Sequence, residues 1–269
     1  MTDERSNYRM TLLGTGSSGG VPRIGGEWGA CDPKEPRNRR GRCSALVERL
    51  DPDGGLSTSI LIDTAPDFRE QCLRQGINRL DAVLLSHDHA DQTHGLDDLR
   101  AIARLMARRV PVYLDRFTAD SLMPKFGYAF EGRGLYPAIL ERKALTRGVV
   151  VELDGPAGSI SALPLDQIHG PIRSLGFRFG PMAYCNDVSE LPDATLEQLT
   201  GLTVLVVDAL RYQPHPTHAH LARTLSWIEM LQPKRAVLTN LHIDLDYKTL
   251  CGELPDGVEP GYDGMTLEA

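Results

Sequence analysis

Residues 86–95 decide the fold. They read Ser-His-Asp-His-Ala-Asp-Gln-Thr-His-Gly and directly follow the apolar run 82–85. That run predicts a buried strand, which places the polar residues on the turn between the strand and a following helix. Because His87 and His89 alternate, both rings can face one point while Asp91 faces a second. Imidazole and carboxylate are the ligands of hydrolytic Zn²⁺ and Mn²⁺, so the stretch predicts a metal site rather than a histidine-rich solvent loop.

Length and composition limit the classes of protein to which the chain can belong. The chain has 269 residues, a formal net charge of −7 and five cysteines. No linker or repeat divides it and the candidate ligands span both halves, so we expect a single domain over residues 1–269. A polar first segment and the lack of a long apolar run predict a cytoplasmic protein that does not cross a membrane. The cysteine number and spacing support no disulfide framework.

The acidic charge makes nucleic acid an unexpected partner, because gripping phosphates relies on clustered Lys and Arg. One basic run, residues 37–42, interrupts this pattern. It has two interpretations, a contact to a phosphorylated ligand or a solvated loop. We expect a small-molecule partner, and a homodimer is left open.

Strand-like runs alternate with turn signals and a few helices. The predicted strands are residues 10–13, 44–48, 59–62, 82–85, 110–114, 149–153, 159–165, 176–179, 182–185, 203–207 and 235–239. The predicted helices are residues 67–75, 195–198, 219–231 and a segment from Gly95 to about Met106. So many strands with few helices exclude a simple βαβ repeat. They favour an α/β fold of two mixed sheets flanked by helices, an αββα sandwich.

Residues 14–19 match Gly-x-Gly-x-x-Gly after a predicted strand, which is the spacing of a dinucleotide-binding turn. That turn must open a helix, and the continuation Gly20-Val21-Pro22 cannot hold one. We therefore predict a glycine-rich loop near the site.

Further candidate ligands stand where predicted strands end. His169 follows the strand 159–165, Asp187 follows 182–185, His242 follows 235–239, and His218 lies in a Pro- and His-rich segment, 214–218. Strand ends are where an α/β scaffold presents its functional residues. Together with residues 86–95 they form a set.

This set resembles the metallo-β-lactamase superfamily, whose His-x-His-x-Asp-His motif is followed by a distant His, an Asp and a final His. The closer resemblance is to PhnP-like phosphodiesterases, relatives of ribonuclease Z that cleave phosphoribosyl cyclic phosphates. It rests on residues 12–22, 42–44, 62–69 and 240–247, and it covers nearly the whole chain.

The resemblance implies a site with two divalent cations, Zn²⁺ or Mn²⁺. His87, His89 and His169 would hold one, Asp91 and His242 the second, and Asp187 would bridge them. Asp91 also counts as a catalytic residue. Two such cations neutralise a phosphodiester and lower the pKa of a water molecule. His218 is the expected general acid, with His215 and His220 as rivals.

Gln92 stands where the superfamily has the last His of its motif. A neutral amide oxygen is a weaker ligand than imidazole. Three outcomes are open: two metals with Gln92 as a weak ligand or just outside the coordination sphere, one metal only, or lost hydrolysis. We favour the first, and His94 is a further candidate for a weak or outer position. Cys31 has no close partner cysteine, so we expect no N-terminal structural zinc.

The favoured function is metal-dependent hydrolysis of a small cyclic-phosphate or nucleotide-like ester. One alternative is tRNA 3′ processing of the ribonuclease Z type, although no basic, Gly/Pro-rich arm is visible. Another is a non-catalytic carrier like the PqqB proteins, which only Gln92 supports. No substrate-binding residue is identified from the sequence.

Overall fold

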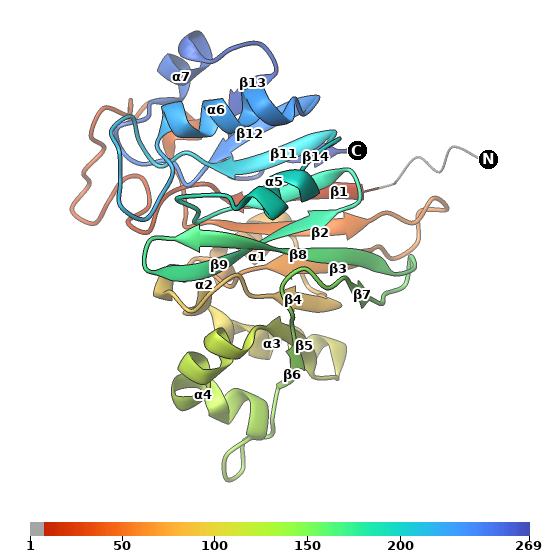
Figure 1. The fold of residues 1–269 in the computed structure, drawn as a ribbon. Coiled ribbons are helices and arrows are strands. Elements are labelled where there is room, and N and C mark those ends of the chain that lie inside the picture. Colours follow the sequence, from red (N-terminus) through yellow and green to blue (C-terminus); the bar gives the residue numbers. More distant parts are fainter. Residues whose placement is uncertain (1–7) are drawn as a thin grey trace.

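The structure is a computed structural model that describes residues 8–269. Two mixed sheets of seven strands each form the body of the molecule, and helices lie on their outer sides (Figure 1). The predicted αββα sandwich is confirmed.

The first sheet contains the N-terminal strands. Its order is β14 (Thr266–Glu268), β1 (Tyr8–Gly14), β2 (Ser44–Arg49), β3 (Thr58–Ile62), β4 (Ala82–Leu84), β5 (Val110–Leu114) and β6 (Leu140–Ala144). Neighbours from β14 to β3 are antiparallel, and neighbours from β3 to β6 are parallel.

The second sheet repeats this division in the C-terminal half. Its order is β13 (Val258–Pro260), β12 (Arg235–Thr239), β11 (Val204–Asp208), β10 (Met182–Cys185), β9 (Ile172–Phe179), β8 (Ile160–His169) and β7 (Val151–Leu153). Neighbours from β7 to β10 are antiparallel, and neighbours from β10 to β13 are parallel.

The helices lie on the outer faces. They are α1 (Phe68–Gln75), α2 (Ala90–Thr93), α3 (Leu99–Met106), α4 (Arg116–Glu131), α5 (Asp193–Gln198), α6 (Leu221–Leu231) and α7 (Tyr247–Glu253), with short 3-10 turns at Pro36–Asn38 and Leu96–Asp98. Apolar residues of α1, α3 and α4 join a cluster with the first sheet, and those of α6 and α7 join one with the second.

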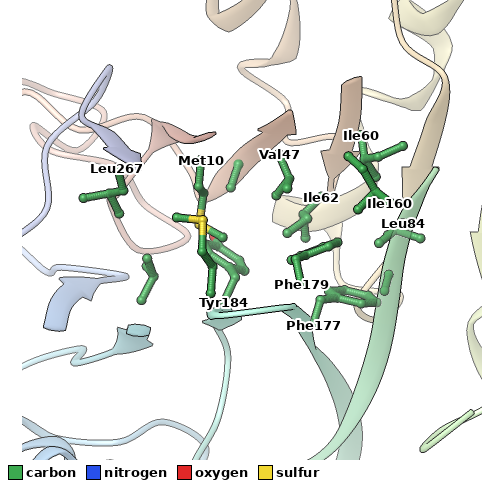
Figure 2. Close-up of a cluster of buried hydrophobic side chains, with 14 of the residues drawn as sticks. Met10, Val47, Ile60, Ile62, Leu84, Ile160, Phe177, Phe179, Tyr184 and Leu267 are labelled. Atoms are coloured by element: carbon green, nitrogen blue, oxygen red, sulfur yellow. The ribbon is translucent and has the colours of Figure 1, made fainter. Parts of the chain in front are cut away.

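A third apolar cluster lies between the sheets. Figure 2 shows Met10 and Ile62 of the first sheet facing Phe177, Phe179 and Tyr184 of the second. These side chains are at most 1 % exposed, and burying one large apolar side chain contributes about 1.5–3 kcal/mol. The packing of the two sheets against each other fixes the positions of the strand ends, and therefore of the site.

The structure corrects several predicted elements. Helix α4 was not predicted because Pro124 and Gly127 interrupt its pattern, yet Asp115 caps it by accepting a hydrogen bond from the Thr118 N–H (2.8 Å). Strands β6, β13 and β14 and helix α7 were also not predicted. Strand β8 does not end at residue 165 but continues to His169, because it stays paired with β9 up to a tight turn.

Residues 15–20 form a loop directly after β1, as predicted. The solvated-loop interpretation of the basic run 37–42 holds only in part, because Arg37 and Arg39 are exposed whereas Asn38 and Arg40 are buried. Arg40 is only 2 % exposed, Arg37 stacks 4.5 Å above the Tyr247 ring, and Arg42 lies 2.9 Å from an Asp67 carboxylate oxygen. The run therefore ties the N-terminal loops to the rest of the domain.

The carboxyl ends of five strands meet at one edge of the sandwich. They carry Asp63 after β3, His87 after β4, Asp187 after β10, Asp208 at the end of β11 and Asn240 after β12. Asp63, Asp187 and Asn240 have positive φ angles of 60°, 49° and 63°. Such backbone is costly for residues other than glycine and concentrates at functional sites.

Candidate metal centre

Three imidazoles come together at this edge. His87 and His89 lie on the turn after β4, and His169 ends β8. Their ring centroids lie 4.5 to 5.1 Å apart, and each offers a nitrogen within 4.8 Å of the others. Three convergent imidazole nitrogens are one of the usual ligand sets of a catalytic zinc site.

Hydrogen bonds set which nitrogen of each buried ring is free. Ser86 Oγ donates to Asp63 (2.8 Å), so it accepts from His87 Nδ1 at 3.0 Å. His169 Nδ1 lies 2.6 Å from the Thr217 carbonyl oxygen and donates to it. Both rings are thereby held as the tautomer whose Nε2 carries a lone pair, the arrangement that outer hydrogen bonds give to metal ligands.

The fit to a cation rests on His87 Nε2. This atom is buried and has no hydrogen-bond partner among residues 8–269. An unpaired buried polar atom costs free energy, and a cation would remove that cost. Burial and the neighbouring imidazoles lower the pKa of His87 well below its usual range, and burial lowers the pKa of His169 to about 4. Neutral rings are the form that binds metal.

Asp187 lies beside this group. Its Oδ2 is 3.9 Å from His87 Nε2, and its Oδ1 accepts a hydrogen bond from Asn240 Nδ2 (3.1 Å). Burial raises the pKa of Asp187 well above its usual range, the His218 imidazole opposes this, and other carboxylates reinforce it. A cation nearby would offset the cost of the buried charge.

His218 lies next to both His169 and Asp187. Its ring centroid is 4.6 Å from that of His169, and its Nδ1 is 2.9 Å from Asp208 Oδ2. Burial alone would lower the pKa of His218, but the Asp208 carboxylate outweighs it and the pKa rises to about 9. Of the three rival histidines, only His218 belongs to a metal-sized group of the described residues, with His169 and Asp187.

The second set of predicted ligands is arranged differently. Asp91 and His242 belong to neither metal-sized group found in residues 8–269. Gln92 Nε2 donates to Asp187 Oδ2 (2.5 Å) and to Asp91 Oδ2 (3.2 Å), while the Arg23 guanidinium contacts His242 Nε2. The residues therefore fit one cation at the three imidazoles, and protein N–H groups face the ligand atoms expected for the second.

His94 points elsewhere. Its side chain is exposed, and its ring lies 5.9 Å from that of Phe126 on α4. His215 lies outside the three-imidazole group, with Nδ1 accepting from the Thr217 N–H at 3.3 Å. His220 heads helix α6.

Comparison with known proteins assigns the family. Residues 58–243 match the model of the β-lactamase superfamily domain. The chain is a member of the β-lactamase superfamily. A solved structure described as a new diphosphatase from the PhnP family shares 38 % identity with this superfamily member, at a TM-score of 0.86 over 97 % of this chain and 98 % of the other. The chain therefore has a hydrolase-type fold.

Two other relatives are more distant or larger. An octanoyltransferase from Porphyromonas gingivalis is 34 % identical over 262 residues, which are 96 % of this chain and 51 % of that protein. This superfamily member thus spans about half the length of that curated relative. Zn²⁺-bound PqqB from Methylobacterium extorquens has a TM-score of 0.74 at 17 % identity and shares the fold.

Sequence reasoning missed four residues of this superfamily site: Arg23, Asp63, Asp208 and Asn240. Asp63 and Asp208 follow apolar strand runs, so the rule that singled out Asp187 could have found them. Asn240 lay in a segment used only for the resemblance. Arg23 has no local signal, because it reaches His242 across 219 positions of the sequence.

Proposed function

We propose that the protein is a metal-dependent phosphodiesterase acting on a small cyclic-phosphate or nucleotide-like ester. The observation that carries the hydrolytic part is the buried, unpartnered His87 Nε2 among three convergent imidazoles, with the His218–Asp208 pair beside them. The phosphate part is supported by the 38 % identity to a PhnP-family diphosphatase. Nucleoside diphosphate esters are therefore the first nucleotide-like compounds to test.

His87, His89 and His169 would hold the cation. A bound divalent cation supplies Lewis acidity at a phosphoryl oxygen and lowers the pKa of water. The chain's own contribution is to keep the imidazoles neutral and oriented through Ser86 and the Thr217 carbonyl.

His218 acts as the general acid. Because Asp208 accepts from Nδ1, Nε2 is the nitrogen left to give a proton to the departing alkoxide oxygen. The same carboxylate holds the pKa of His218 at about 9, so the ring carries that proton at neutral pH.

A ribonuclease Z or carrier function has less support. Human and yeast tRNase Z structures resemble the chain at 16 % and 13 % identity, which reflects the fold alone. The PqqB structure resembles the chain at 17 % identity, which likewise reflects the fold alone. In the described part of the chain, no helix is both long enough and apolar enough to span a bilayer.

Hydrolysis of bis-p-nitrophenyl phosphate by purified protein loaded with Mn²⁺ or Zn²⁺ tests the proposal. We expect turnover, with Mn²⁺ at least as effective as Zn²⁺, and then turnover of a cyclic phosphate or a nucleoside diphosphate ester. No turnover with either metal would reject a phosphodiesterase. Turnover of a tRNA precursor alone would favour the nuclease.

A further inference from the structure

The second half of the candidate metal centre already contains protein groups where a second cation would lie. Gln92 is 1 % exposed on α2, and its Nε2 lies between carboxylate oxygens of Asp91 and Asp187, at 3.2 and 2.5 Å. The Thr64 N–H donates to the Gln92 carbonyl (2.7 Å), which fixes the backbone there. One amide nitrogen thus links the two carboxylates that the resemblance assigns to the second metal.

The orientation of this amide follows from charge. If the amide turned over, its Oε1 would face the two carboxylates, which is repulsive unless a cation lies between them. With Nε2 toward the carboxylates, the N–H groups donate to both acceptors without any cation, and Gln92 Oε1 is the atom left buried without a hydrogen-bond partner among residues 8–269. The Gln92 amide N–H groups therefore contact both carboxylates in the position that a bridging cation would otherwise occupy.

Arg23 supplies the positive charge that a second cation would otherwise provide. A guanidinium has N–H donors and no acceptor atom, so His242 Nε2 must be the acceptor in their contact. Because Nε2 accepts, the proton of the neutral ring is on His242 Nδ1, which lies 3.0 Å from Asp244 Oδ2 without meeting hydrogen-bond geometry. The lone pair that would bind a metal is directed at Arg23.

The glycine-rich loop before Arg23 leaves space for the Arg23 side chain. A Cβ on Gly19 would lie only 3.2 Å from Arg23 Cγ, so the glycine leaves room for the side chain. Arg23 Nη1 is 3.6 Å from Glu27 Oε2, and the side chain remains 37 % exposed. A guanidinium has five N–H donors in a planar fork, and those not used by His242 can reach a ligand in solvent.

In place of the two cations expected from the sequence, we propose a one-cation site. Only His87, His89 and His169 bind a divalent cation. Gln92 and Arg23 replace the second, and the Arg23 guanidinium binds a phosphate oxygen of the substrate. The phosphate role rests on the proposed function, whereas the number of cations does not.

Metal content tests the number of cations. Full-length protein equilibrated with excess Mn²⁺ and freed of unbound metal should contain one ion per chain by elemental analysis. Its electron paramagnetic resonance spectrum should be that of an isolated ion. The double variant Arg23→Ala/Gln92→His should contain two ions with a spin-coupled spectrum, because it frees His242 and restores the superfamily imidazole.

Two controls accompany this measurement. Arg23→Lys keeps the positive charge and should keep one ion, and Glu27→Gln removes only the outer partner of Arg23 and should also keep one. Circular dichroism shows whether each variant is folded. Two coupled ions in the wild type would overturn the proposal. A folded double variant that still binds one ion would overturn the replacement role of Arg23 and Gln92.

Binding of inorganic phosphate to the Mn²⁺-loaded protein tests the role of Arg23. Arg23→Ala should weaken binding by about tenfold or more, since a charge-assisted hydrogen bond is lost, and Arg23→Lys should recover part of it. Unchanged affinity in Arg23→Ala would overturn this role. A wild type with one ion but no phosphodiester turnover would reject the proposed function and leave the one-cation site standing.

Discussion

The two halves of the metal centre contain similar ligand types, but the ligand atoms of the two halves have different hydrogen-bond partners. In the half formed by His87, His89 and His169, hydrogen bonds hold the Nδ1 atoms of His87 and His169, His169 Nε2 lies 3.3 Å from His89 Nδ1, and His87 Nε2 has no partner among the described residues. In the other half, Gln92 Nε2 and Arg23 already contact Asp187 Oδ2 and His242 Nε2, and the atoms left without a hydrogen-bond partner among the described residues are Gln92 Oε1 and His242 Nδ1. A set of metal-ligating residue types is therefore not sufficient for a metal site, because donor atoms must also be left free.

The supports of the two halves differ as well. The first half is oriented by Ser86, which lies next to His87 on the turn after β4, and by the Thr217 carbonyl, which holds His169. The segment that carries His242 is held from the N-terminal loops, where Arg40 Nη1 donates to the His242 carbonyl (3.3 Å) and Asn38 Nδ2 donates to Asp246 (2.6 Å). Changes to the first half should therefore affect chemistry, and changes around Asp246 should affect stability.

The largest effect is expected from His169→Ala. It removes a ligand from the first half, so the chain should lose its bound metal and about a thousandfold or more of its phosphodiesterase activity. Elemental analysis and initial rates measure both. His94→Ala is the matched control, since His94 lies against Phe126, and it should keep both. A His169→Ala variant with full metal content would place the cation elsewhere.

His218→Ala comes next. It should slow hydrolysis of esters with poor leaving groups by about a hundredfold, because general acid catalysis contributes about that much, and activated p-nitrophenyl esters much less. Metal content should stay the same. Equal losses for both ester types would remove the general-acid role, and loss of the metal would make His218 a ligand together with His169 and Asp187.

Metal removal should produce a smaller effect on stability. A cation bound only by the folded chain contributes about 2.7 kcal/mol to the free energy of unfolding when free metal is about 100 times its Kd. EDTA should therefore lower the melting temperature of the wild type. His169→Ala should show no such shift, and a wild type that melts at the same temperature with and without EDTA would contradict a cation in the first half.

The smallest effect concerns the support of the His242 segment. Asp246 caps α7 by accepting from the Thr249 N–H (2.9 Å), so Asp246→Ala should destabilise the protein by about 1–2 kcal/mol in urea unfolding at neutral pH. Metal bound in the first half should be retained. A loss of less than a few tenths of a kcal/mol would show that the cap and its partners are dispensable.

The same residue predicts a pH dependence. Partial burial would raise the pKa of Asp246, but hydrogen bonds from the Thr249 and Asp32 N–H groups lower it from 3.8 to about 2. A lowered carboxyl pKa stabilises the fold above the unfolded value, and this contribution is lost as the pH falls through the folded value. The difference between wild type and Asp246→Ala should therefore shrink between about pH 4 and pH 2. A difference independent of pH would assign it to packing.

Much of the fold could be predicted because its signals are local. Apolar runs followed by polar residues located β3, β4, β10, β11 and β12, and the same rule found His87 and Asp187. Helix α4 escaped because tertiary packing overrides the interruptions at Pro124 and Gly127. The same rule could have found Asp208, whereas no sequence signal near Arg23 indicates its contact with His242.

The sequence by itself determined the sandwich and the residue types available at its edge, because strand periodicity and strand ends are read over a few positions. Only the tertiary structure decided which donor atoms are free. The Thr217 carbonyl that orients His169 is 48 positions away, and Gln92 reaches Asp187 across 95. Such contacts depend on how the two sheets pack, and they determine which half of the site is left to a cation.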